Sequence, residues 1–117
     1  DALAYIQAKG YAPIVVSNHA MSDEDRARLL PEVSAYIERY NYGYDFGGYR
    51  DGILEVKDLL ADLEKLVLLN DSCWFPLPNG SDWIRDAEAL DLDCVGAASH
   101  QGSKPFDATK FRTTVPK

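Results

Sequence analysis

The chain has 117 residues, of which 46% are hydrophobic and 26% charged, which suits one compact domain and is too short for two ordinary ones. Its formal net charge of -7 disfavours broad electrostatic binding to nucleic acid or an anionic membrane, because neutralising phosphates takes concentrated lysine and arginine. No apolar run approaches the ~20 residues of a membrane span. We expect no transmembrane segment and no nucleic-acid partner.

Cys73 and Cys94 lie in different predicted elements and show no metal-ligand spacing, so we expect free thiols in a reducing compartment, with the cytoplasm as the expected location. The first residues show neither the basic nor the apolar part of a signal peptide. The chain opens directly inside a helix-like pattern without an initiator methionine. We therefore expect a piece of a longer protein, truncated at both ends. The domain prediction is a single α/β unit over residues 1–117, with an irregular tail over residues 100–117.

Hydrophobic spacing and turn signals predict helices and strands in alternation. Gly10 is placed to end the first helix, and Ser22 followed by Asp25 resembles a capping box at the start of the second. Ser81 or Asp82 can cap the last helix. The pattern predicts helices at residues 2–9, 23–30, 49–63 and 82–90, and strands at residues 13–17, 33–39, 66–69 and 94–98.

This alternation predicts the α/β class, with a largely parallel sheet and right-handed crossovers. Ligands of such sheets bind outside the carboxyl ends of the strands. Two polar segments follow predicted strands, at residues 41–52 and 70–72. The sequence therefore predicts a nucleotide-type crevice that both segments line.

The first polar segment is rich in glycine, with Gly43, Gly47 and Gly48 where a strand turns into a helix. Glycines there permit positive φ angles and close approach of a ligand, and the new helix offers backbone N–H groups to a phosphate. The alternative is a tight loop in which Asp45 acts as a cap and Phe46 and Tyr49 plug the core.

The second polar segment is Asn70-Asp71-Ser72, directly after an apolar run. One carboxylate with two hydrogen-bonding neighbours suits a hydrated Mg2+ or Mn2+ ion. The alternative is an Asx or Ser turn that only ends the strand.

Taken together, the two segments resemble the rhamnan synthesis protein F family of glycosyltransferase-like proteins. Members carry Arg-x-Asn-x-Gly-Tyr-Asp-Phe-Gly, then a helix, then a strand that ends in Asn-Asp-Ser. Here the first motif begins at Arg39 and ends at Gly47, and the second lies at residues 70–72. The resemblance covers roughly residues 1–98.

The resemblance implies a three-layer α/β/α fold with a mostly parallel, Rossmann-like sheet, forming half of a GT-A nucleotide-sugar domain. It implies transfer of rhamnose or a related sugar from a donor such as dTDP-rhamnose to a glycan acceptor during cell-surface polysaccharide synthesis. The parent protein would act at the inner face of the membrane, by peripheral association.

The same resemblance implies roles for particular residues. Asp71 would hold the divalent ion, and Asp45 would act as catalytic base or contact the donor sugar. The expected nucleotide-sugar-binding residues are Ser17, Asn18, Arg39, Asn41, Gly43, Gly47, Arg50, Asn70 and Ser72.

Two other classes compete with this interpretation. A noncatalytic α/β interaction domain would use both polar segments as turns, and Trp74 and Phe75 as a protein contact. A phosphate-ester hydrolase with Asp71 as nucleophile is disfavoured, because Cys73 stands where a second carboxylate is usual.

Overall fold

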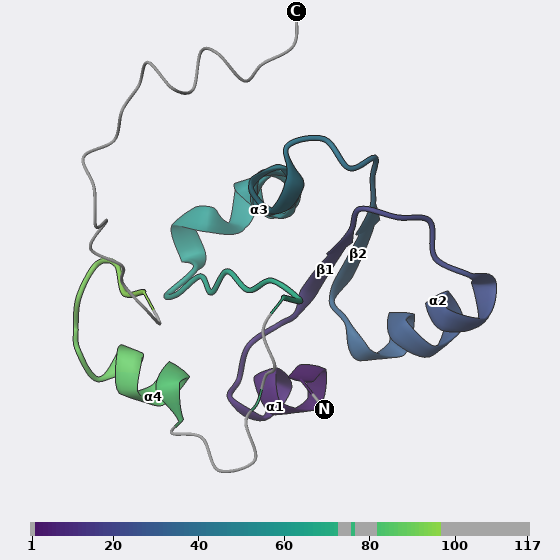
Figure 1. Cartoon of the computed structure of the whole chain (residues 1–117). Helices are drawn as coiled ribbons and strands as arrows, with labels where there is room; N and C mark the ends of the chain where they lie inside the picture. Colours follow the sequence, from purple (N-terminus) through teal and green to yellow (C-terminus); the bar gives the residue numbers. More distant parts are fainter. Residues whose placement is uncertain (1, 73–75, 77–81, 97–117) are drawn as a thin grey trace, which may run out of the picture. The chain divides into compact units, whose positions relative to one another are not determined.

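A computed structural model describes residues 2–72, 76 and 82–96 (Figure 1). The chain divides into two compact units, residues 1–78 and 79–117. In chain order the elements are α1 (Ala2–Ala8), β1 (Ile14–Ser17), α2 (Asp23–Leu29), the 3-10 helix η1 (Leu30–Glu32), β2 (Ala35–Glu38), α3 (Tyr44–Glu55), the 3-10 helix η2 (Lys57–Asp62) and, in the second unit, α4 (Trp83–Glu88). The predicted α/β class is confirmed, as a small parallel sheet with several helices. Among the described residues, no helix has the length and apolar character needed to cross a membrane.

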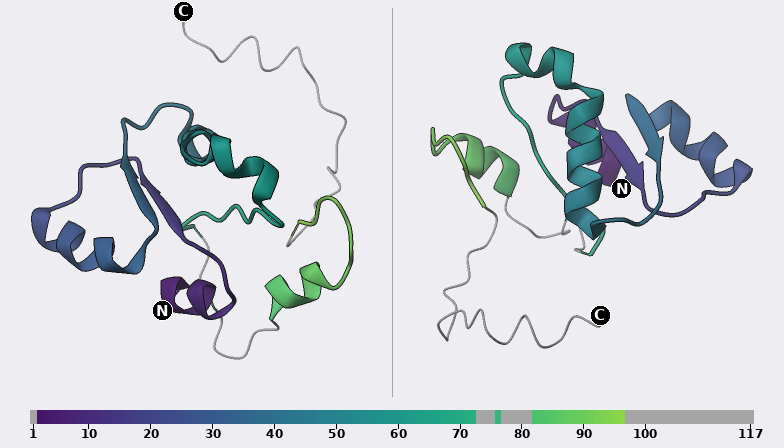
Figure 2. Two further views of the ribbon diagram at one scale, coloured as in Figure 1. Left: turned by 180° about the vertical axis from the view of Figure 1, so that it is seen from behind. Right: turned by 90° about the horizontal axis from the view of Figure 1, so that it is seen from above.

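The sheet of the first unit consists of β1 and β2, which pair in parallel from Ile14 opposite Ala35 to Ser17 opposite Glu38. The strands lie between α3 on one side and α2 on the other (Figures 1 and 2). Because the strands are parallel, their carboxyl ends meet at one edge. The residues that follow them therefore emerge side by side.

Local signals explain how the chain connects the two strands. The Ser22 hydroxyl accepts a hydrogen bond from the Asp25 backbone N–H at 3.1 Å, which confirms the predicted cap of α2. Pro31 lies within η1, directly after α2, at a position where proline needs no backbone donor. The predicted end of this helix is therefore also confirmed.

The Glu38 carboxylate joins β2 to the start of α2. Its Oε2 accepts hydrogen bonds from the Met21 backbone N–H at 3.2 Å, from Arg26 Nη2 at 3.0 Å and from the Tyr36 hydroxyl at 2.9 Å. The bond from Met21 and the other donors stabilise the ionised form and lower the pKa of Glu38. The charged Glu38 carboxylate thus links the carboxyl end of β2 to α2 and to the residue before it.

Helix α3 differs from its prediction, since it begins at Tyr44 rather than at Tyr49 and gives way to η2 after Glu55. Gly43 stands at its N-cap with φ +79°, whereas Gly47 and Gly48 lie inside the helix. Gly48 is buried, and a Cβ built on it would lie 3.8 Å from Val16 Cγ1 in β1. Of the three glycines, only Gly43 takes the positive φ expected of the whole segment; the other two allow close packing.

The predicted strand at residues 66–69 is not present, because the structure assigns no secondary structure there. A strand needs a hydrogen-bonded neighbour, and within the described residues β1 and β2 pair only with each other. Leu66, Leu68 and Leu69 are exposed. The described residues therefore form a two-stranded parallel sheet with helices and do not show the three-layer arrangement that the resemblance implies.

The second unit contains α4, shorter than the predicted helix at residues 82–90. Asp82 occupies the N-cap position, although its side chain makes no capping hydrogen bond, and Ser81 lies outside the described residues. Residues 94–96 of the last predicted strand carry no regular structure, and residues 97–98 lie outside the described part.

Candidate functional site

The centre of the candidate site is the Arg39 guanidinium, at the carboxyl end of β2. Its Nε donates to Asp51 Oδ2 at 2.6 Å, its Nη1 to Asn18 Oδ1 at 2.5 Å and its Nη2 to the Tyr42 carbonyl at 2.5 Å. The side chain is only 12% exposed. Arg39 therefore ties the end of β1, the loop before α3 and α3 itself into one unit, a role that suits its rigid fork of donors.

Asp51 is a residue of the site that was not among the residues predicted from the sequence. Its carboxylate bridges two arginines, with Oδ2 accepting from Arg39 and Oδ1 accepting from Arg50 Nη1 at 2.9 Å. The hydrogen bond from Arg39 is the main cause that lowers the pKa of Asp51. The spacing offered a signal, because Asp51 follows Gly47 by one helical turn and so shares its face.

Gly47 is required at its position by close approach rather than by backbone conformation. A Cβ built on Gly47 would lie 2.1 Å from the Tyr42 carbonyl oxygen and 2.8 Å from Arg39 Nη2. No larger residue fits without moving the backbone. The glycine-rich motif thus creates the space in which the Arg39 network forms.

The two polar segments meet in the structure. Asn70 Nδ2 donates a hydrogen bond to Asp45 Oδ2 at 3.2 Å, so the Asn-Asp-Ser segment lies at the first turn of α3. This contact agrees with the expectation that both segments line one site. It arises although residues 66–69 form no strand.

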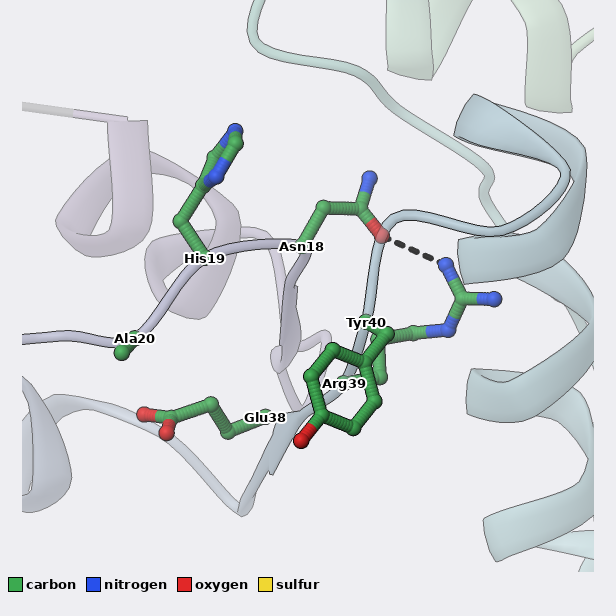
Figure 3. A pocket seen from close by; sticks show the side chains of 6 residues that line it. All are labelled: Asn18, His19, Ala20, Glu38, Arg39 and Tyr40. Atoms are coloured by element: carbon green, nitrogen blue, oxygen red, sulfur yellow. Dashed lines mark hydrogen bonds between the residues drawn. The ribbon is translucent and has the colours of Figure 1, made fainter.

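Two open hollows flank Arg39. One, of about 460 Å³, is lined by Asn18, His19, Ala20, Glu38, Arg39 and Tyr40 (Figure 3). Figure 3 shows the Arg39 guanidinium directed toward Asn18, away from the carboxylate of Glu38. The other, of about 580 Å³, is lined by Arg39, Tyr42, Gly43, Phe46, Gly47, Arg50 and Asp51.

The remaining predicted residues divide by their environment. Ser17 is engaged locally, since its hydroxyl donates to the His19 carbonyl at 2.7 Å. Arg50 has a side chain that is 72% exposed, so its guanidinium reaches solvent beyond its contact with Asp51. Exposed positions are also found for Asn41, Asp45, Asp71 and Ser72. Trp74 and Phe75, the predicted protein contact, lie outside the described residues.

Asp71 is the carboxylate expected to hold a divalent ion. Within the described ranges, no three His, Cys, Asp or Glu side chains gather into a complete set of metal ligands. Mg2+ commonly binds through one or two carboxylates and completes its shell with water and substrate phosphates. A single carboxylate such as Asp71 is compatible with a site of this kind, in which water and substrate phosphates supply the other ligands. It is not compatible with a site in which the protein supplies every ligand.

Comparison with known proteins bears on the same motifs. A family model described as rhamnan synthesis protein F matches residues 13–115. The chain belongs to this family. The resemblance predicted from the two motifs is therefore confirmed, and the rhamnan synthesis protein F match spans the whole candidate site.

One curated relative is an uncharacterized protein, y4gN, of Sinorhizobium fredii (strain NBRC 101917 / NGR234). It is 39% identical over 102 residues, which cover 87% of this chain. The chain spans 27% of that protein's length. No solved structure matches the chain.

Proposed function

We propose that this rhamnan synthesis protein F domain binds a nucleotide-sugar donor and belongs to a glycosyltransferase that adds rhamnose or a related sugar to a cell-surface polysaccharide. The observation that carries the proposal is the hydrogen bond between Asn70 and Asp45. It joins the two family motifs at one place, next to the edge where parallel α/β sheets bind ligands. The family name links such chains to polysaccharide synthesis.

The proposed donor is dTDP-rhamnose or a similar molecule, and the proposed acceptor is a glycan. Glycosyl transfer requires stabilisation of the negative charge that grows on the departing nucleoside diphosphate. The exposed Arg50 guanidinium is suited to this task, while Arg39, with three protein partners, holds the site in shape. A divalent ion bound with the diphosphate would share this charge, held by Asp71 with Asn70 and Ser72 beside it.

The acceptor hydroxyl needs a base, and Asp45 is the proposed one. Its carboxylate is exposed at the first turn of α3, and the amide of Asn70 orients it. An oriented carboxylate within hydrogen-bond reach of a hydroxyl is a competent general base. For the fold we propose a GT-A-like domain, supported by the parallel β1–β2 pair and by the order of the two motifs. We place the parent at the cytoplasmic face of the membrane, by peripheral association.

The direct test is a thermal-shift titration with dTDP and with UDP, each with and without Mn2+. A ligand that binds only the folded state stabilises it by about 2.7 kcal/mol at 100 times its Kd. We expect a metal-dependent rise in Tm that Asp71→Asn removes and the control Asp58→Asn, an exposed aspartate of η2, keeps. Equal shifts in both variants, or none in the unaltered chain, would contradict the donor site.

One observation favours a second candidate, a noncatalytic interaction domain. Exposed leucines recur from the end of α3 up to the residue before the Asn-Asp-Ser segment, at Leu54, Leu59, Leu60, Leu63, Leu66, Leu68 and Leu69. Where exposed apolar side chains gather into one patch, they often mark a protein contact. This candidate predicts concentration-dependent association in sedimentation experiments, with no nucleotide effect on Tm.

A further inference from the structure

The loop that joins β2 to α3, with the first turn of α3, presents four aromatic rings to solvent. The exposed fractions are 95% for Tyr40, 84% for Tyr42, 76% for Tyr44 and 83% for Phe46. Aromatic side chains gain more than most residues from burial. Single exposed apolar residues are common on protein surfaces, but a group of four exposed rings within seven residues is not. This segment is therefore a candidate binding surface.

The backbone beneath the rings is held in a fixed shape. The Tyr42 carbonyl accepts from Arg39 Nη2, and the Tyr42 N–H donates to the Tyr40 carbonyl at 2.7 Å. Gly43 and Tyr44 both have positive φ, +79° and +49°. Such a φ is uncommon for tyrosine and persists where the surroundings impose it, which is frequent at ligand sites.

The Phe46 ring is also oriented, although most of it faces solvent. It meets the Tyr49 ring edge to face, with centroids 6.2 Å apart and planes at 81°. Aromatic rings held in this way offer a large contact area at a low cost in conformational entropy. The surface is thus arranged before any ligand arrives.

Tyr42 and Phe46 share the hollow of about 580 Å³ with Arg39, Arg50 and Asp51. Its volume falls in the range of ~300–1,000 Å³ typical of small-molecule sites. The lining combines apolar ring faces with guanidinium and carboxylate groups. A pyranose ring matches both, because it has C–H groups on one face and hydroxyls around its rim.

We propose that Tyr42 and Phe46 form a stacking platform for a sugar ring of the glycan acceptor, with Asp51 near its hydroxyls. The inference rests on the proposed function and adds to it the residues that receive the acceptor. The net charge of -7 suits a neutral polysaccharide better than an anionic polymer. Family membership links the chain to such a polysaccharide.

The test is saturation-transfer NMR with an L-rhamnose disaccharide, in the absence of nucleotide and metal. We expect binding by the unaltered chain and a Kd about tenfold higher in Tyr42→Leu and Phe46→Leu, equal to ~1.4 kcal/mol. Tyr42→Phe and Phe46→Tyr keep the rings and should keep the Kd within about twofold, a change of ~0.4 kcal/mol. Leu30→Ala, which removes an exposed apolar side chain in η1, is the matched control.

Because Tyr42 and Phe46 are exposed, leucine there should leave folding intact, and a thermal melt of each variant verifies this. Absence of a disaccharide signal, or equal Kd values in the leucine and ring-keeping variants, would overturn the platform. Self-association that the leucine variants abolish would also overturn it, by showing a protein contact.

The dTDP thermal shift, measured on the same variants, separates this inference from the proposed function. Disaccharide binding without any dTDP shift would contradict the donor site and leave the platform standing. A dTDP shift lost in the leucine variants, without disaccharide binding, would assign the rings to the nucleotide and overturn the platform.

Discussion

The side-chain amide of Asn70 donates a hydrogen bond to Oδ2 of Asp45 at 3.2 Å. The two residues belong to different motifs and are 25 positions apart. Both side chains are exposed, so little apolar burial accompanies the contact. Its significance is positional, because it holds the Asn-Asp-Ser segment at the first turn of α3.

Replacing Asn70 by aspartate should turn this contact into repulsion. Two carboxylates at ~3–4 Å in a solvent-rich setting repel by about 1 kcal/mol. Asn70→Asp should therefore be less stable than Asn70→Ala at pH 7 by about this amount. Urea unfolding of both variants measures the difference, which should disappear at low pH, where carboxyl groups are protonated. A gap that persists in acid would point to a cause other than charge.

Gly47 and Gly48 should respond oppositely to alanine, although they are neighbours in one helix. Alanine in a helix interior gains up to ~1 kcal/mol over glycine. At Gly48 the new Cβ meets Val16 Cγ1 at an ordinary 3.8 Å, so Gly48→Ala should be neutral or stabilising. At Gly47 it would meet the Tyr42 carbonyl at 2.1 Å, so Gly47→Ala should lose about 1–3 kcal/mol. Thermal melts of the two variants measure the difference in stability. Equal Tm values for Gly47→Ala and Gly48→Ala would contradict the close approach of Gly47 to the Tyr42 carbonyl.

The sequence predicted the ends of helices correctly where a single capping or helix-ending residue determines them. Gly10, Ser22 and Pro31 ended or capped helices as expected, because their effects come from a few neighbouring backbone groups. The two motifs meet as expected, through the Asn70–Asp45 hydrogen bond, although the strand that was predicted to lead into the second motif is absent. These inferences needed no knowledge of packing.

The predictions that failed depended on tertiary contacts. The start of α3 was misplaced because Gly47 and Gly48 lower helix propensity, whereas here their small size lets the helix approach Tyr42 and Val16. Asp51 was missed because its hydrogen bond with Arg39, 12 positions earlier, is a tertiary contact. The apolar run at residues 66–69 carried a strand pattern, but a strand also needs a partner edge.

Arg39 should not tolerate replacement by lysine. A lysine ammonium carries charge but cannot reach Asp51, Asn18 and the Tyr42 carbonyl together. We expect Arg39→Lys to lower Tm by about 5 °C or more. The matched control Arg28→Lys alters an exposed pair with Glu24 within α2 and should change Tm little. Similar Tm values for both variants would show that the network adds no stability.

Stability should fall at both extremes of pH. The pKa values of Glu38 and Asp51 are lowered from 4.5 and 3.8, so their contribution is present above these values and is lost as pH falls through the folded values. The pKa of Tyr36 is raised from 10.0, mainly by burial, so its contribution is lost as pH rises above 10.0. Thermal melts from acid to alkaline pH measure the loss of Tm at each extreme. In Glu38→Gln the fall of Tm at acid pH should be smaller than in the unaltered chain. An equal fall would show that ionised Glu38 does not contribute to stability.

The two arginines of the site should separate binding from stability. Arg50 is 72% exposed and its guanidinium extends beyond Asp51, whereas Arg39 is 12% exposed within its network. Loss of a charged hydrogen bond to a phosphate costs ~1.5–3 kcal/mol, so Arg50→Gln should weaken dTDP binding about tenfold or more and leave Tm without ligand nearly unchanged. Calorimetric titration with dTDP and Mn2+ measures the affinity, with Arg28→Gln as a control for lost surface charge. If Arg50→Gln and Arg28→Gln bind dTDP equally well, Arg50 does not contact the diphosphate, and the charge on the leaving group must be met elsewhere in the site.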